Sequence, residues 1–133
     1  MRKLALIAVL TAAIASPAVA LEPIQKNPTV IRGFYAIGLA DEVRKNCDTI
    51  DPRMFRAYNY LRSLARFAQK AGYTDAEIEQ LTENREEKER LRKIIRADLA
   101  KRGASPKSPE GYCTVGREEI AKNSAAGRLL RTK

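Results

Sequence analysis

The sequence predicts an all-α protein, a compact bundle of four to five helices cross-linked by one disulfide and preceded by a cleaved signal peptide. Apolar residues recur at three- and four-residue spacing over most of the chain, which is the helical period. The sequence contains no alternating strand pattern, internal repeat or low-complexity stretch. We therefore expect a signal peptide over residues 1–20 and a single helical domain over residues 21–133.

The first twenty residues have the parts of a secretory signal. Arg2 and Lys3 form a basic start, residues 4–15 are apolar, and Ala18 and Ala20 have the small-x-small spacing that signal peptidase cleaves. The apolar run of about 12 residues is shorter than the roughly 17 that a spanning helix needs, so an N-terminal anchor is the less favoured alternative. We expect a periplasmic or secreted protein that does not span the membrane after cleavage.

Two cysteines in an exported chain predict a disulfide between Cys47 and Cys113. The bond would close a loop of about 67 residues, for which loop entropy gives about 4 kcal/mol of stabilisation. The alternative is a pair of free thiols. The sequence has neither the CxxC spacing nor the histidine that would favour a reactive thiol.

Two Asx-Pro pairs indicate where the first two helices begin. Asn27 and Pro28 supply an N-cap and a first-turn proline, and we expect a helix over residues 28–47. Asp51 and Pro52 repeat that signal and predict a second helix that ends at Gly72. The second helix carries a broad apolar stripe that we expect to face the core: Met54, Ala57, Tyr58, Leu61, Leu64, Ala65, Ala68 and Ala71.

The third segment begins with a capping box formed by Thr74 and Glu77. Residues 82–90 are polar on every face, which favours a bend or break near Asn84 over one solvated helix. Helical periodicity resumes at residue 91 and stops at Gly103. A last helix is expected from about Pro109 to about residue 130, with a row of mostly small residues on one face: Cys113, Gly116, Ile120, Ser124 and Gly127.

The composition excludes most catalytic and metal chemistry. The chain has no histidine, which removes Ser-His-Asp and Cys-His catalysis and most zinc sites. Phosphate-binding, dinucleotide-binding, zinc-protease and thioredoxin motifs are also missing from the sequence. We therefore expect no cofactor, no metal site and no enzymatic activity.

The basic surplus lies in the last third of the chain. Residues 21–87 contain ten basic and eleven acidic side chains, whereas residues 88–133 contain thirteen and five. We expect a face that docks an anionic envelope surface or an unidentified protein, while nucleic acid is disfavoured by export and by the scarcity of aromatic residues. The alternative is a solvated surface that Glu86, Glu89 and Asp98 partly neutralise. The candidate face comprises Arg85, Lys88, Arg92, Lys93, Arg96 and Arg102, and a second row comprises Arg62, Arg66 and Lys70.

Asp41 continues a helical row with Phe34 and Ile37, and we expect it to face inward while Glu42 points elsewhere. A buried acid with a raised pKa would suit general acid or base catalysis in a cleft between the first and last helices. The favoured alternative is a structural ion pair. The candidate buried polar residues are Asp41, Arg56, Arg117 and Glu119.

Several segments of the sequence, taken together, resemble those of a known family. They are residues 37–44 with Cys47, residues 56–58 with Leu61, residues 72–78, residues 112–113, residues 116–120 and residues 127–131. In this combination the chain resembles domain-of-unknown-function family 5333, which comprises small exported alphaproteobacterial proteins. The resemblance implies an exported helical domain with one disulfide, and it implies no activity.

The favoured function is a non-enzymatic exported module that binds a protein or an anionic surface. The alternatives are an enzyme using carboxylates and arginines around Asp41, and a periplasmic stress holdase.

Overall fold

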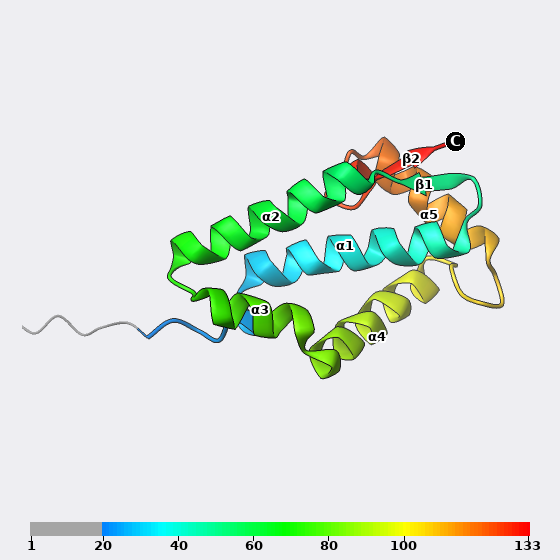
Figure 1. The fold of residues 1–133 in the computed structure, drawn as a ribbon. Helices are drawn as coiled ribbons and strands as arrows, with labels where there is room; N and C mark the ends of the chain where they lie inside the picture. Colours follow the sequence, from blue (N-terminus) through cyan, green and yellow to red (C-terminus); the bar gives the residue numbers. More distant parts are fainter. Residues whose placement is uncertain (1–19) are drawn as a thin grey trace, which may run out of the picture.

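The computed structural model describes residues 20–133, so the expected signal peptide lies outside the described residues except for Ala20. This part contains five α-helices, and the long helix α1 lies at the centre of the others (Figure 1). Helix α1 runs between α2 and α4, and α5 lies across its C-terminal end. The α-helices are α1 (Pro28–Asn46), α2 (Met54–Ala71), α3 (Asp75–Glu83), α4 (Arg85–Lys101) and α5 (Glu110–Ala121). Two short 3₁₀ helices, η1 (Ile24–Lys26) and η2 (Gly127–Leu129), and two strands, β1 (Ile50–Pro52) and β2 (Leu130–Thr132), complete the fold.

Helix α1 begins where the sequence predicts, because the Asn27 side chain accepts hydrogen bonds from the amides of Thr29 and Val30 at 3.0 and 3.2 Å. Glycines then mark its closest contacts with its neighbours. A Cβ at Gly33 would lie 2.4 Å from Leu64 of α2, and one at Gly38 would lie 2.5 Å from Ile95 of α4. Helix α1 is therefore packed from several sides, with buried residues around most of its circumference.

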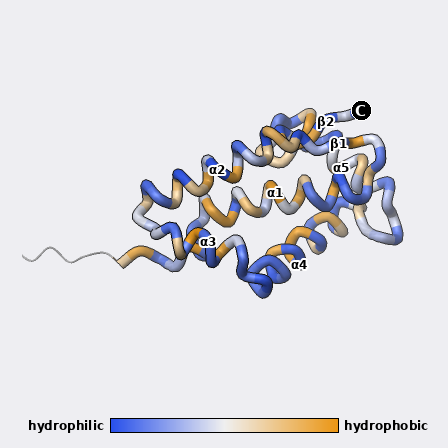
Figure 2. Tube along the Cα trace, viewed as in Figure 1, coloured by the Kyte–Doolittle hydropathy of each residue, from blue (hydrophilic) through white to orange (hydrophobic). Residues whose placement is uncertain are grey.

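The break near Asn84 is confirmed. Asn84 has extended backbone angles, ends α3 and caps α4 by accepting the Glu87 amide at 3.0 Å. The predicted capping box between Thr74 and Glu77 is also present, and Gly72 ends α2 with a φ of 104°, in the left-handed region that favours glycine. The α3–α4 corner is strongly hydrophilic (Figure 2).

The start of the second helix differs from the expectation. Residues 50–52 form β1, which pairs antiparallel with β2 so that Ile50 lies opposite Thr132 and Pro52 opposite Leu130. Helix α2 therefore begins at Met54 and not at Asp51. The prediction of a chain without strands is wrong at this point, because pairing with the C-terminus decides the conformation of the Asp51-Pro52 segment.

The last helix is also shorter than expected, since α5 ends at Ala121. Asn123 has a φ of 51°, which turns the chain, and the Ser124 hydroxyl donates back to the Glu119 carboxylate. Ser124 and Gly127 consequently do not extend the predicted helical row. Instead, the chain folds back through η2, and Leu130 enters the core from β2 with 1% of its surface exposed.

Two hydrophobic clusters hold the elements together. The larger one joins α1, α4, α5 and both strands around Val43, Leu99, Val115 and Leu130. The predicted disulfide between Cys47 and Cys113 is confirmed, with a Cα–Cα distance of 5.1 Å, and it borders this cluster. The smaller cluster joins η1, α1 and α2 and contains Ile24, Val30, Ala68 and Tyr73.

Candidate functional site

Asp41 does not occupy the inward position that the sequence predicts. Its side chain is about one-third exposed and accepts hydrogen bonds from Arg44 at 2.9 Å and Lys45 at 2.5 Å, both on the same helix. Burial opposes ionisation of Asp41, but the hydrogen bonds from Lys45 and Arg44 lower its pKa below the ordinary value of 3.8. The pKa therefore moves in the opposite direction from the one that a general acid near neutral pH requires.

Glu42 is the buried carboxylate of this region, with 6% of its surface exposed. Its two carboxylate oxygens accept hydrogen bonds from the Arg96 guanidinium of α4 at 3.2 and 3.3 Å. Helix α1 has neighbours on several sides, so the row containing Phe34 and Ile37 is only half-buried and does not define the core side. Arg56 and Arg117, which the sequence analysis gave as candidate buried polar residues, are exposed, so that prediction is wrong for both.

Glu119 is buried, as expected, and joins α5 to the end of α4. Arg102 lies 2.8 Å from the Glu119 carboxylate and 3.0 Å from that of Glu118. Burial of Glu119 opposes ionisation, but hydrogen bonds from Ser124 and Arg102 outweigh it, so the pKa of Glu119 lies below its ordinary value of 4.5. This arrangement is a satisfied structural ion pair.

Replacing Glu119 with glutamine should lower the free energy of unfolding near neutral pH by about 1.5 kcal/mol, because Arg102 loses a charged partner. A carboxylate whose pKa is lower in the folded state stabilises the fold above its unfolded pKa, and that stabilisation is lost as pH falls through the folded pKa. The difference between wild type and Glu119→Gln should therefore shrink in urea unfolding series carried from neutral pH to below 4.5. A difference independent of pH would contradict this role.

The six residues of the predicted basic face do not form one unpaired surface. Arg92 pairs with Glu89, Arg96 with Glu42, and Arg102 with Glu118 and Glu119. The other three residues, Arg85, Lys88 and Lys93, are exposed on α4. Three of the six expected cations are thus paired with carboxylates. The partners of Arg96 and Arg102 lie on other helices, so the local sequence did not reveal these two pairings.

Comparison with known proteins places the chain in a family without assigning it an activity. The model of a family of unknown function, DUF5333, matches residues 22–131. The chain belongs to this family. No curated protein and no solved structure matches the chain. The function of this DUF5333 protein must therefore be argued from its own geometry.

A basic segment without acidic residues covers α2 of this DUF5333 domain and the residue before it. From residue 53 to residue 74 the chain has five basic residues and no acidic one, and within the described residues none of the five forms a salt bridge. One of them, Arg62, places its guanidinium over the Tyr58 ring, 5.7 Å from the centroid. The five residues are Arg53, Arg56, Arg62, Arg66 and Lys70.

The same helix exposes large apolar side chains. Met54 is 66% exposed, Phe55 78% and Tyr58 59%, whereas Leu64 and Ala68 are buried against the core. The prediction that the whole stripe faces the core is therefore wrong for Met54 and Tyr58, and also for Leu61, which is 38% exposed. We use the term α2 face for the exposed set Met54, Phe55, Tyr58, Arg62 and Arg66. The lack of acidic residues between positions 53 and 74 was the sequence signal that could have identified this face.

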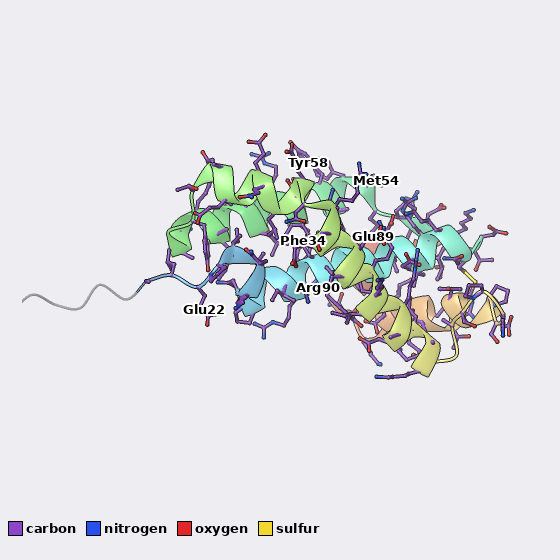
Figure 3. The ribbon with its side chains drawn as sticks, turned by 90° about the horizontal axis from the view of Figure 1, so that it is seen from below. Glu22, Phe34, Met54, Tyr58, Glu89 and Arg90 are labelled. Carbon is purple, nitrogen blue, oxygen red and sulfur yellow. A yellow bond between two sulfur atoms is a disulfide. The ribbon has the colours of Figure 1, made fainter. Side chains whose placement is uncertain are left out.

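An apolar groove of about 260 Å³ adjoins the α2 face and is floored by α1. Phe34 of α1 and Leu61 of α2 line it, and Leu81 of α3 closes one side. Figure 3 shows Phe34 lying between Met54 and Tyr58 on one side and Arg90 of α4 on the other. The apolar character of the α2 face thus continues into the interior of the bundle.

Residues 20–133 contain neither a helix suited to crossing a bilayer nor a cluster of three or more side chains that could bind a metal ion. No helix there is both long enough and apolar enough to cross a bilayer. No three or more of the His, Cys, Asp and Glu side chains in this part of the chain are grouped so that they could hold a metal ion.

Proposed function

We propose that this protein is an exported, non-enzymatic module that docks on an anionic lipid surface through the α2 face. The observation that carries the proposal is the combination, on one exposed helix, of unpaired cations with highly exposed Met54, Phe55 and Tyr58. Export is supported by the signal features of residues 1–20. Helices that lie in the plane of a membrane interface combine these same two properties.

Electrostatics favours α2 over α4 as the docking element. Basic side chains near an anionic membrane contribute about 1 kcal/mol each, provided that neighbouring acids do not neutralise them. Arg62 and Arg66 are exposed and have no carboxylate partner among the described residues, whereas Arg92 pairs with Glu89 and Arg96 with Glu42. Exposed cations of α4 such as Lys88 and Lys93 lie among acidic residues of the same helix, whereas residues 53–74 contain no carboxylate that could neutralise the cations of α2.

The shape and composition of α2 also favour a lipid surface over a protein partner. Its 18 residues form a rod of about 27 Å on the outside of the bundle (Figure 1), which suits contact with a plane. The exposed surface of α2 combines Met54, Phe55 and Tyr58 with the guanidinium groups of Arg62 and Arg66. In a lipid interface, Phe55 and Tyr58 would enter the region below the headgroups while Arg62 and Arg66 contact phosphates.

Vesicle flotation of the protein lacking residues 1–20 tests this proposal. We expect binding to vesicles of phosphatidylcholine mixed with phosphatidylglycerol, and little binding to phosphatidylcholine alone. The double variant Arg62→Gln/Arg66→Gln loses two contacts of about 1 kcal/mol each, so its partition coefficient should fall by about 30-fold. Phe55→Ser should also weaken binding with little effect on folding, because Phe55 is 78% exposed.

The matched control is Lys88→Gln/Lys93→Gln, which removes two exposed cations from α4. This variant should retain most of the binding. An equal loss in both double variants would show that net charge, and not the α2 face, drives association. Equal binding to neutral and anionic vesicles would contradict the proposal, as would binding to an acidic protein surface in the absence of binding to anionic vesicles. A stress holdase would instead suppress aggregation of an unfolded client without requiring lipid charge.

A further inference from the structure

A second, polar cleft lies on a different part of the molecule, between the C-terminal half of α1, the second half of α4 and the connection that leads into α5. Its volume is about 590 Å³, which lies within the range of small-molecule sites. The connecting segment, residues 102–109, passes the C-terminal end of α1 in Figure 1. Besides Ser105 of the connection, the polar side chains that line the cleft come from α1, α4 and α5: Glu42, Lys45, Asn46, Arg92, Arg96 and Tyr112.

The cleft lining is positively charged. Lys45, Arg92 and Arg96 supply three cations, and Glu42 supplies the one carboxylate. Both oxygens of Glu42 accept hydrogen bonds from Arg96, so this pair holds the Arg96 guanidinium at the wall of the cleft. A concave site with an excess of one charge concentrates the opposite charge inside it.

The other two cations have partners that a ligand can replace. Lys45 pairs with Asp41, and Arg92 pairs with Glu89, but neither carboxylate lines the cleft. Both are pairs within one helix turn whose side chains are partly exposed. Such pairs contribute little free energy, so an anion in the cleft competes with them at small cost.

Tyr112 provides a hydrogen-bond donor without a protein acceptor. The residue is only 4% exposed, yet its hydroxyl has no hydrogen-bond partner among the described residues. Because no fully enclosed side-chain polar atom lacks a partner in the described residues, this hydroxyl retains contact with solvent, and Tyr112 lines the cleft. It also lies within electrostatic range of the Arg96 guanidinium. A buried tyrosine hydroxyl normally finds a partner, and a ligand in the cleft that Tyr112 lines would supply one.

We propose that this cleft binds a small multivalent oxyanion, a di- or tricarboxylate or a phosphate, with Arg92, Arg96 and Lys45 contacting its oxygens and Tyr112 donating one hydrogen bond. Four donors that line one cleft suit an acceptor with several oxygens, and guanidinium groups bind carboxylate and phosphate in bidentate geometry. The site shares no residue with the α2 face and stands independently of lipid docking.

Two-dimensional NMR titration of the protein lacking residues 1–20 with citrate, inorganic phosphate and acetate, at fixed ionic strength, tests the inference. We expect saturable shifts at Tyr112 and Arg96 with citrate or phosphate, and much weaker binding of monovalent acetate. Saturation by citrate alone would identify a carboxylate ligand, and saturation by phosphate alone a phosphate ligand. Arg92→Gln should weaken binding about tenfold, which corresponds to one charge-assisted hydrogen bond.

Two further variants separate binding from folding. Arg90→Gln removes a cation that pairs with Glu87 in the same way that Arg92 pairs with Glu89, but it lies outside the cleft, so anion affinity should be unchanged. Tyr112→Phe should weaken binding about fivefold and leave the free energy of unfolding unchanged, because the hydroxyl has no partner in the described part of the protein. The inference is overturned by equal effects of Arg90→Gln and Arg92→Gln, or by shifts that do not saturate with any of the three anions.

Discussion

Replacing both cysteines with alanine should lower the free energy of unfolding by about 4 kcal/mol. Cys47 and Cys113 are 66 residues apart in sequence, so the disulfide excludes many extended conformations of the unfolded chain. In the folded protein the bond joins the C-terminal end of α1 to the first turn of α5. A domain of this length has a total stability of roughly 5–15 kcal/mol, so the loss is a large fraction of it.

Urea unfolding of the wild type and of Cys47→Ala/Cys113→Ala measures this effect. Alanine retains each Cβ atom, so the buried position of Cys47 loses little more than sulfur. Wild type unfolded in the presence of a reductant should approach the stability of the double variant. A loss below about 1 kcal/mol would indicate that the packing of α1 against α5 already restricts the chain as much as the disulfide does.

Gly127→Ala is expected to destabilise the protein by about 3 kcal/mol or more. A Cβ at position 127 would lie 1.9 Å from the Glu119 carbonyl oxygen and 2.7 Å from the Ile120 nitrogen. These are backbone atoms at the end of α5, so no side-chain rotation relieves the overlap. The start of η2 must move, and β2 with the fully buried Leu130 must move with it.

Gly38→Ala is the matched control. A Cβ at Gly38 would contact only the Ile95 side chain, whose terminal Cδ1 atom lies 2.5 Å away and can rotate. Alanine also favours the helical conformation, which offsets part of the cost. Thermal and urea unfolding should therefore give a loss of about 1 kcal/mol or less for Gly38→Ala. Equal losses in the two variants would contradict the close approach of η2 to α5.

The parts of the fold that the sequence predicts depend on local signals. Asn27 caps α1, Thr74 and Glu77 form their capping box, and Asn84 interrupts the chain between α3 and α4, because each motif acts within one turn of helix. Pairings between distant segments are not visible in such patterns. Strand β1 is three residues long, too short to show alternation, and it forms only because β2 lies beside it.

The candidate site was less predictable for the same reason. Glu42 is buried because Arg96, 54 residues later in the chain, reaches it from α4. Helix α1 has neighbours on several sides, so helical periodicity alone gave Asp41 as the inward residue, one position away. Met54 and Tyr58 fit the apolar period of α2, but no other part of the bundle covers them, and they are 66% and 59% exposed. The amphipathic pattern therefore identified the helix, but it did not show which part of the apolar stripe is buried by the rest of the bundle.

The most direct test of lipid docking places a fluorescent reporter on the α2 face. The chain contains no tryptophan, so Phe55→Trp introduces a single emitter at a position that is 78% exposed. Ile94→Trp, on α4 at a residue that is 42% exposed, is the control. With vesicles containing phosphatidylglycerol, we expect a blue shift and quenching by lipid-borne quenchers for Phe55→Trp and no change for Ile94→Trp. An unshifted emission at position 55, or a larger shift at position 94, would contradict docking through α2.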